Sequence, residues 1–256
     1  MSACEVHAIV TGRPDGPVVV LSNSLGATHR MWDNQLEALD ERFRVVRYDT
    51  RGHGDSPVPD GSYSIDDLTD DVVALLDRLD VAHAHVVGLS LGGMTAMRLA
   101  ARNPERVDRM VLLCTAAQLP PAENWLERAD MVRTKGSGAV AESVVARWFT
   151  PGYLSAHPDI RTTHERMVTG TSAQGYAGCC EVIAKMDLRQ ELSSIGAPTL
   201  AIAGADDPAT PPALLKEIVA GIPDSRLLVV EQAAHLANAE RPATVTPAVI
   251  AHLEDS

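Results

Sequence analysis

Several features that the sequence lacks exclude whole classes of protein. No apolar run approaches the ~20 residues that a membrane-spanning helix needs. The first residues, Met1 to Glu5, have neither the basic segment nor the apolar stretch of a secretory signal. There are only four cysteines and no CxxC pair, so neither a zinc site nor a disulfide framework is indicated. We expect a soluble, cytoplasmic protein without a metal site.

Positive charge is also scarce. The chain has 22 Lys and Arg against 34 Asp and Glu, a formal net charge of −12, and its basic residues form no runs. Nucleic acids and anionic membranes are bound through basic patches, so we expect neither as a partner. A small-molecule substrate that carries a carboxylate would have to be bound by individual arginines, because the overall charge does not attract it.

Short apolar runs alternate with helical stretches along most of the chain. Residues 6–10 and 18–21 flank a segment dense in turn formers, which predicts an antiparallel hairpin. Ser64 and Asp67 fit a capping box in front of a long amphipathic helix. The alternation predicts a mostly parallel α/β sheet. Further strands are expected at 43–48, 84–87, 107–114, 199–203 and 226–230, and helices at 31–39, 91–102, from 211 onward, and 242–253.

The pattern changes after the predicted strand at 107–114. From 119 to 186 there is no strand-like run, and helical stretches at 123–132, 140–149, 161–168 and 176–186 are joined by Gly and Pro turns. We interpret this part as a helical cap inserted into the core. The expected organisation is a first core part at 1–117, a cap at 118–187 and a second core part at 188–256.

Ser90 is the first candidate for chemistry. It lies in the pattern Gly88-x-Ser90-x-Gly92, between an apolar strand and a helix-favouring stretch. A serine on such a tight turn needs neighbours without Cβ atoms, and the turn brings the Leu91 N–H and the helix N-terminus beside its hydroxyl. The pattern therefore indicates a nucleophile with an oxyanion donor. The alternative is a glycine-rich connection whose serine is only an N-cap.

A serine nucleophile needs a base and a group that orients the base. His235 follows the predicted strand at 226–230, at the edge of the sheet where active sites of open parallel sheets collect. Asp206 and Asp207 both follow the strand at 199–203, and we choose Asp207 as the orienting acid, with the neighbour as a turn or cap residue. The order Ser, Asp, His is the one expected for this topology. A surface loop histidine is the alternative for His235.

Four segments together resemble the α/β-hydrolase superfamily, namely residues 49–56, 88–92, 204–211 and 232–235. Residues 21–32, 147–152 and 235–242 further resemble the 3-oxoadipate enol-lactone hydrolases within it. The resemblance spans essentially the whole chain. It implies the α/β-hydrolase fold, with a mostly parallel central sheet, helices on both faces and an inserted helical cap. It also implies a Ser-His-Asp triad that needs no cofactor.

The family geometry assigns the second oxyanion donor to the backbone N–H of Leu25, beside that of Leu91. Many members carry His-Gly at the positions of Asn23 and Ser24 in this chain. We therefore expect Ser24 to adopt an unusual backbone angle. The alternative interpretation of this segment is an ordinary polar loop without a role in chemistry.

The activity that the resemblance implies is hydrolysis of 3-oxoadipate enol-lactone through an acyl-enzyme on Ser90. That lactone carries a carboxylate, which calls for a cation. Candidates in the predicted cap are Arg128, Arg133, Lys135 and Arg147, with Trp125, Met131 and Trp148 as apolar walls. Alternatives are a carboxylesterase or cofactor-free perhydrolase of the same fold, and a non-catalytic ligand-binding protein on a hydrolase scaffold.

Overall fold

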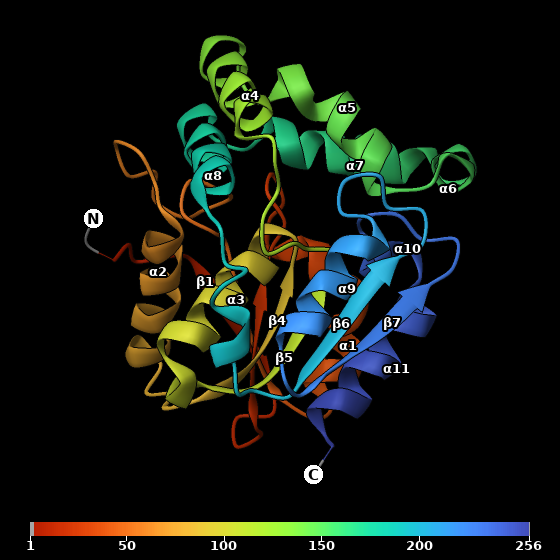
Figure 1. Cartoon of the computed structure of the whole chain (residues 1–256). Coiled ribbons are helices and arrows are strands. Elements are labelled where there is room, and N and C mark those ends of the chain that lie inside the picture. Colours follow the sequence, from red (N-terminus) through yellow and green to blue (C-terminus); the bar gives the residue numbers. More distant parts are fainter. Residues whose placement is uncertain (1–2, 256) are drawn as a thin grey trace.

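The computed structural model describes residues 3–255, and a seven-stranded sheet runs through the centre of this part (Figure 1). The strand order is β1-β3-β2-β4-β5-β6-β7, and every pair is parallel except β1 with β3. The predicted mostly parallel α/β sheet is confirmed. The strands are β1 Ala8–Gly12, β2 Val18–Ser22, β3 Arg44–Tyr48, β4 Ala84–Leu89, β5 Val107–Leu113, β6 Thr199–Gly204 and β7 Ser225–Val230.

The predicted hairpin between residues 6–10 and 18–21 is wrong. β1 and β2 are antiparallel in direction, but β3 lies between them and pairs with both. The burial of the two strands explains this arrangement. β2 is almost fully buried and has parallel partners on both sides, as its unbroken apolar sequence requires, whereas half-exposed β1 suits the edge of the sheet.

Helices cover both faces of the sheet. α1 (Asp33–Asp40) and α11 (Pro242–Leu253) pack together on one face, and α2 (Ile65–Arg78), α3 (Leu91–Arg102) and α9 (Pro212–Gly221) cover the other (Figure 1). The predicted capping box is confirmed, because Ser64 and Asp67 each accept a backbone N–H from the other. The bounds of α3 match its predicted range, since the Gly88 to Gly92 turn defines where it starts.

Helices α4 to α8 lie together over the carboxyl edge of the sheet, between β5 and β6 in sequence (Figure 1). They are α4 Ala122–Lys135, α5 Gly138–Trp148, α6 Pro151–Ala156, α7 Pro158–Thr169 and α8 Ala173–Lys185. α4 packs on α8, and α5 packs on α7. α6 was expected as a turn, but Thr150 caps it by accepting the Tyr153 N–H, and Pro151 occupies its first turn. The chain before α4 and the chain after α8 meet where the Leu188 N–H donates to the Ala117 carbonyl at 2.9 Å.

Among residues 3–255, no helix is both long enough and apolar enough to cross a bilayer.

Candidate active site

The turn at Ser90 is as tight as the sequence indicated. Ser90 has φ 55° and ψ −115°, a strained conformation for a residue with a Cβ atom. A Cβ on Gly88 would lie 2.3 Å from the Gly92 carbonyl, and one on Gly92 would lie 2.2 Å from that of Ser22, so both positions require glycine. In this structure the Ser90 side chain makes no capping hydrogen bond to α3, which argues against the N-cap alternative.

The segment that carries Leu25 lies beside this turn. Ser22 and Gly88 are paired at the ends of parallel strands β2 and β4, so the residues after them share one edge of the sheet. The Asn23 side chain fixes the segment, donating to the Tyr48 carbonyl at 2.7 Å and accepting the Trp32 indole N–H at 2.9 Å. Leu25 and Leu91 follow the two strand ends, which brings both predicted oxyanion donors to the same edge as Ser90.

The expected backbone strain at Ser24 is not observed. Ser24 is absent from the described residues with positive φ, and the left-handed conformation falls instead on Gly26, with φ 78°. A Cβ at Gly26 would lie 2.9 Å from the Tyr176 ring. The Gly26 N–H donates to Nε2 of His53 at 3.0 Å, which requires His53 to be neutral. Burial lowers the pKa of His53, in agreement with a neutral ring that accepts this hydrogen bond. The left-handed conformation of this segment therefore lies two residues after Ser24, at a glycine, where it carries no Cβ penalty.

Asp207 and His235 meet after β6 and β7. His235 Nδ1 lies 2.8 Å from Asp207 Oδ2, and the Thr210 hydroxyl donates to the same oxygen at 2.6 Å. The other oxygen accepts the N–H groups of Ala209 and Thr210 at 2.8 and 3.1 Å. Burial alone would raise the pKa of Asp207, but the charge of His235 and these hydrogen bonds lower it. An ionised Asp207 holds the proton of His235 on Nδ1, which leaves Nε2 as a proton acceptor.

Asp206 has a different environment. Its N–H donates to the Ala233 carbonyl at 2.9 Å, and it lines a separate surface hollow with Gln232 and Arg241. The geometry therefore favours Asp207 over Asp206 as the partner of His235.

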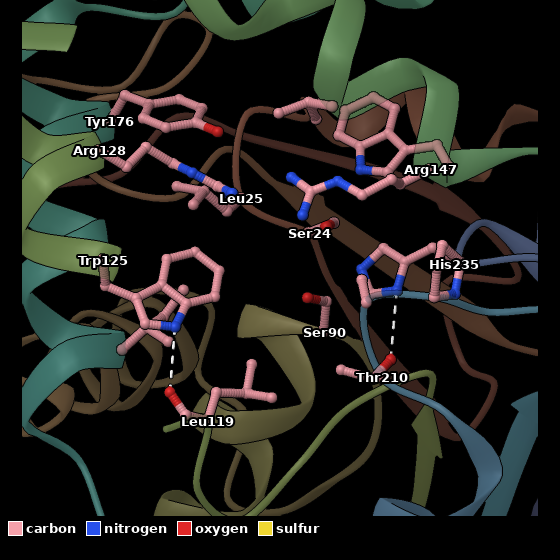
Figure 2. Close-up of a pocket in the computed structure, with 15 residues that line it drawn as sticks. Ser24, Leu25, Ser90, Leu119, Trp125, Arg128, Arg147, Tyr176, Thr210 and His235 are labelled. Carbon is pink, nitrogen blue, oxygen red and sulfur yellow. Dashed lines mark hydrogen bonds between the residues drawn. The ribbon is translucent and has the colours of Figure 1, made fainter. Parts of the chain in front are cut away.

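Ser90 and His235 face one cavity of about 130 Å³ between the sheet edge and helices α4, α5 and α8 (Figure 2). Its walls are mostly apolar, and seven of the fifteen lining residues come from α4, α5 and α8. The lining residues are Ser24, Leu25, Ser90, Leu119, Trp125, Arg128, Val144, Arg147, Trp148, Tyr176, Ile183, Pro208, Ala209, Thr210 and His235. The structure thus brings four of the candidate substrate-binding residues, Trp125, Arg128, Arg147 and Trp148, to the same space as Ser90 and His235.

Two guanidinium groups reach into the space beside Ser90 (Figure 2). Arg128 lies over the Trp125 ring at 4.7 Å, and Arg147 donates from Nε to the Ser143 carbonyl at 3.3 Å. Burial and then the charge of Arg128 lower the pKa of Arg147, so the two cations repel one another across the cavity. Among the described residues, neither arginine has a carboxylate within 4.0 Å. An anionic group bound between them would relieve that repulsion.

Arg133, also predicted to bind substrate, is not among the residues that line the cavity. Its guanidinium donates to Glu181 on α8 at 2.5 Å, so its charge is already paired. The helix geometry explains the difference, because Trp125 and Arg128 are three residues apart on one face of α4, whereas Arg133 is five residues beyond Arg128. Met131, a predicted apolar wall, is 43% exposed.

Sequence reasoning missed Tyr176 and Thr210. Thr210 stands three residues after Asp207, a spacing at which hydroxyl and carboxylate side chains commonly interact, so a local signal was present. Tyr176 on α8 has no such signal, because the packing of α8 against α4 brings it to the cavity. Burial raises the pKa of Tyr176, so its hydroxyl stays protonated and can donate a hydrogen bond.

Comparison with known proteins agrees with this geometry. The family model of the alpha/beta hydrolase fold matches residues 17–242. The chain is 41% identical to 3-oxoadipate enol-lactonase 2 of Acinetobacter baylyi over 238 residues, which cover 93% of this chain and 89% of that protein.

Solved structures give the same result. The enol-lactonase from Burkholderia xenovorans LB400 superposes with a TM-score of 0.95 at 41% identity, covering 98% of this chain and 96% of that one. An esterase from Thermogutta terrifontis superposes with a TM-score of 0.90 at 29% identity, covering 96% and 91%. Fold, motif order and relatives lead to one conclusion: the chain is a hydrolase that belongs to the α/β-hydrolase fold family.

Proposed function

We propose that this protein hydrolyses 3-oxoadipate enol-lactone, a small lactone with a free carboxylate, through an acyl-enzyme on Ser90. The observation that carries the proposal is the cavity that Ser90 and His235 line together with the guanidiniums of Arg128 and Arg147, neither of which has a carboxylate partner among the described residues. The 41% identity to an enol-lactonase over most of both chains supports the same substrate. In this proposal residues 118–187 form a cap that selects the acyl group.

The first half of the reaction forms the acyl-enzyme. Ser90 Oγ attacks the lactone carbonyl while His235 Nε2 takes its proton, and Asp207 stabilises the resulting imidazolium. The backbone N–H groups of Leu25 and Leu91 hold the negative charge on the carbonyl oxygen. Collapse of this intermediate breaks the ring C–O bond, and His235 returns the proton to the enol oxygen.

The second half releases the product. The enol converts to its ketone, so the leaving group no longer competes for the acyl carbon. A water molecule, deprotonated by His235, attacks the acyl-enzyme and frees Ser90. The sum is one lactone and one water giving one 3-oxoadipate. The chain's own residues supply every acid and base in this scheme, and Ser90 is the nucleophile of the first half, whereas water is the nucleophile of the second.

The carboxylate of the substrate lies between Arg128 and Arg147 in this proposal, with Trp125 and Trp148 as walls of the ring site. Arginine suits this role because its planar N–H groups match the two oxygens of a carboxylate. Arg133 is left out, because Glu181 already neutralises it.

The decisive experiment compares 3-oxoadipate enol-lactone with neutral lactones and simple esters on the purified protein. We expect the highest kcat/KM for the anionic lactone. Equal or greater activity on the neutral compounds would reject this substrate and favour the second candidate, a carboxylesterase, which the similarity to the Thermogutta esterase and the mostly apolar cavity walls support. Binding of the lactone without any turnover would also reject the proposed activity.

A further inference from the structure

Two segments far apart in the sequence meet beside the cavity: the α5–α6 junction, residues 148–150, and the His235 loop, residues 233–240. The Leu236 N–H donates to the Trp148 carbonyl at 2.8 Å. The Trp148 side chain lines the cavity, and Leu236 directly follows His235. One hydrogen bond therefore joins a wall of the cavity to the residue beside its histidine.

Glu240 connects the same two segments a second time. It is 3% exposed and ends the short helix α10 (Ala237–Glu240). Its Oε2 accepts the Ala234 N–H at 2.9 Å, while Oε1 accepts the Thr150 N–H at 3.1 Å and a short hydrogen bond from the Thr150 hydroxyl. One buried carboxylate thus satisfies backbone donors of both segments.

The other side of α10 is fixed to the core. The side-chain amide of Asn238 donates to the Met31 carbonyl at 2.9 Å, and the backbone carbonyl of Asn238 accepts from the side-chain amide of Gln35 at 2.9 Å. The Met31 sulfur in turn accepts the Ser24 N–H at 3.3 Å. The core therefore holds α10 in place, and Glu240 at the end of α10 contacts both the α5–α6 junction and the His235 loop.

We propose that Glu240 is a positioning residue that sets the His235 loop and the α5–α6 junction in one arrangement, so that His235 and the Trp148 wall are placed together. This role rests on the proposed function. It requires a carboxylate, because the groups directed at Glu240 are donors, and a carboxylate accepts hydrogen bonds without donating any. A glutamine would turn its NH₂ group toward one of the two backbone donors.

The test compares Glu240→Gln, Thr150→Val and Thr150→Ser with a matched control, Glu231→Gln, which changes an exposed glutamate at the start of the same strand-to-helix connection. The substrate is 4-nitrophenyl acetate, which reports acyl transfer whatever the natural acyl group is. We expect Glu240→Gln to lower kcat by about 10- to 100-fold, because small misplacements of catalytic groups have effects of this size. The pH profile of kcat/KM should move as well.

The threonine pair tests the same contact from the junction side. Thr150→Val removes the hydroxyl that donates to Glu240 and should lower kcat, whereas Thr150→Ser keeps the hydroxyl and should restore it. Glu231→Gln should behave as the wild type. Circular dichroism and thermal melting show which variants are folded at the assay temperature.

The positioning role is refuted if folded Glu240→Gln keeps the kcat, KM and pH profile of the wild type, or loses only melting temperature. If that variant does not fold, equal kcat for Thr150→Val and Thr150→Ser refutes the role. Absence of wild-type activity on every ester and lactone would reject the proposed function instead. In that case the low-field NMR signal of the His235 Nδ1 proton tests the positioning role. We expect this signal to shift in Glu240→Gln and in Thr150→Val, and an unchanged signal in either variant would exclude the role.

Discussion

Replacement of Arg147 by methionine tests the proposed carboxylate site most directly. The Arg147 guanidinium is partly buried at the cavity, lacks a carboxylate partner among the described residues, and is destabilised by the nearby charge of Arg128. An anion between these two cations gains charge-assisted hydrogen bonds and relieves their repulsion. Methionine keeps much of the side-chain length but removes the charge.

The expected magnitude follows from the energy of such contacts. A hydrogen bond to a charged group contributes about 1.5–3 kcal/mol, and 1.36 kcal/mol corresponds to a tenfold change in an equilibrium or rate constant. Loss of Arg147 should therefore raise KM for the anionic lactone by about 10- to 150-fold. Because Arg128 still faces the cavity, we expect Arg147→Met in the lower half of this range and the double variant Arg128→Met with Arg147→Met in the upper half.

The assay is steady-state hydrolysis of 3-oxoadipate enol-lactone and of a neutral lactone of similar size. KM for the neutral compound should change little, because it has no carboxylate to lose. Arg133→Met is the matched control, since this arginine lies on α4 but its charge is paired with Glu181. The reasoning is refuted if Arg147→Met raises KM equally for both compounds, or if Arg133→Met has the same effect as Arg147→Met.

Three further predictions concern the proposed triad of Ser90, Asp207 and His235. Ser90→Ala should lower kcat on an activated ester by several orders of magnitude, and unchanged turnover would exclude the serine mechanism. Asp207→Asn should reduce kcat far more than Asp206→Asn, because only Asp207 contacts His235; the reverse result would move the role by one residue. The pKa of Asp207 is lowered in the folded protein, so its ionisation stabilises the fold fully above the unfolded pKa, about 3.9, and this contribution is lost as pH falls through the folded pKa. Urea unfolding between pH 7 and pH 3 should therefore show a steeper acid loss of stability in the wild type than in Asp207→Asn, and parallel curves would contradict the assignment.

Features governed by neighbouring residues could be predicted from the sequence. The turn at Ser90 follows from the glycines that flank it, because a Cβ at Gly88 or Gly92 would clash with backbone atoms. The helix after Ser64 follows from its capping box. The meeting of Asp207 and His235 follows from chain order alone, since residues after the carboxyl ends of parallel strands collect at one edge of the sheet.

Tertiary structure alone decided which distant residues meet. The first hairpin was wrong because a turn specifies a change of direction but not which strand becomes the neighbour, and β3 takes the place between β1 and β2. Glu181 on α8 pairs Arg133, whereas Arg128 and Arg147 remain directed at the cavity. Amphipathic periodicity gives the faces of a helix but not its partners. The sequence by itself determined the turn at Ser90, the meeting of Asp207 and His235 at one edge of the sheet, and the fold class. The packing of α4, α5 and α8 determined which side chains line the cavity beside Ser90 and His235.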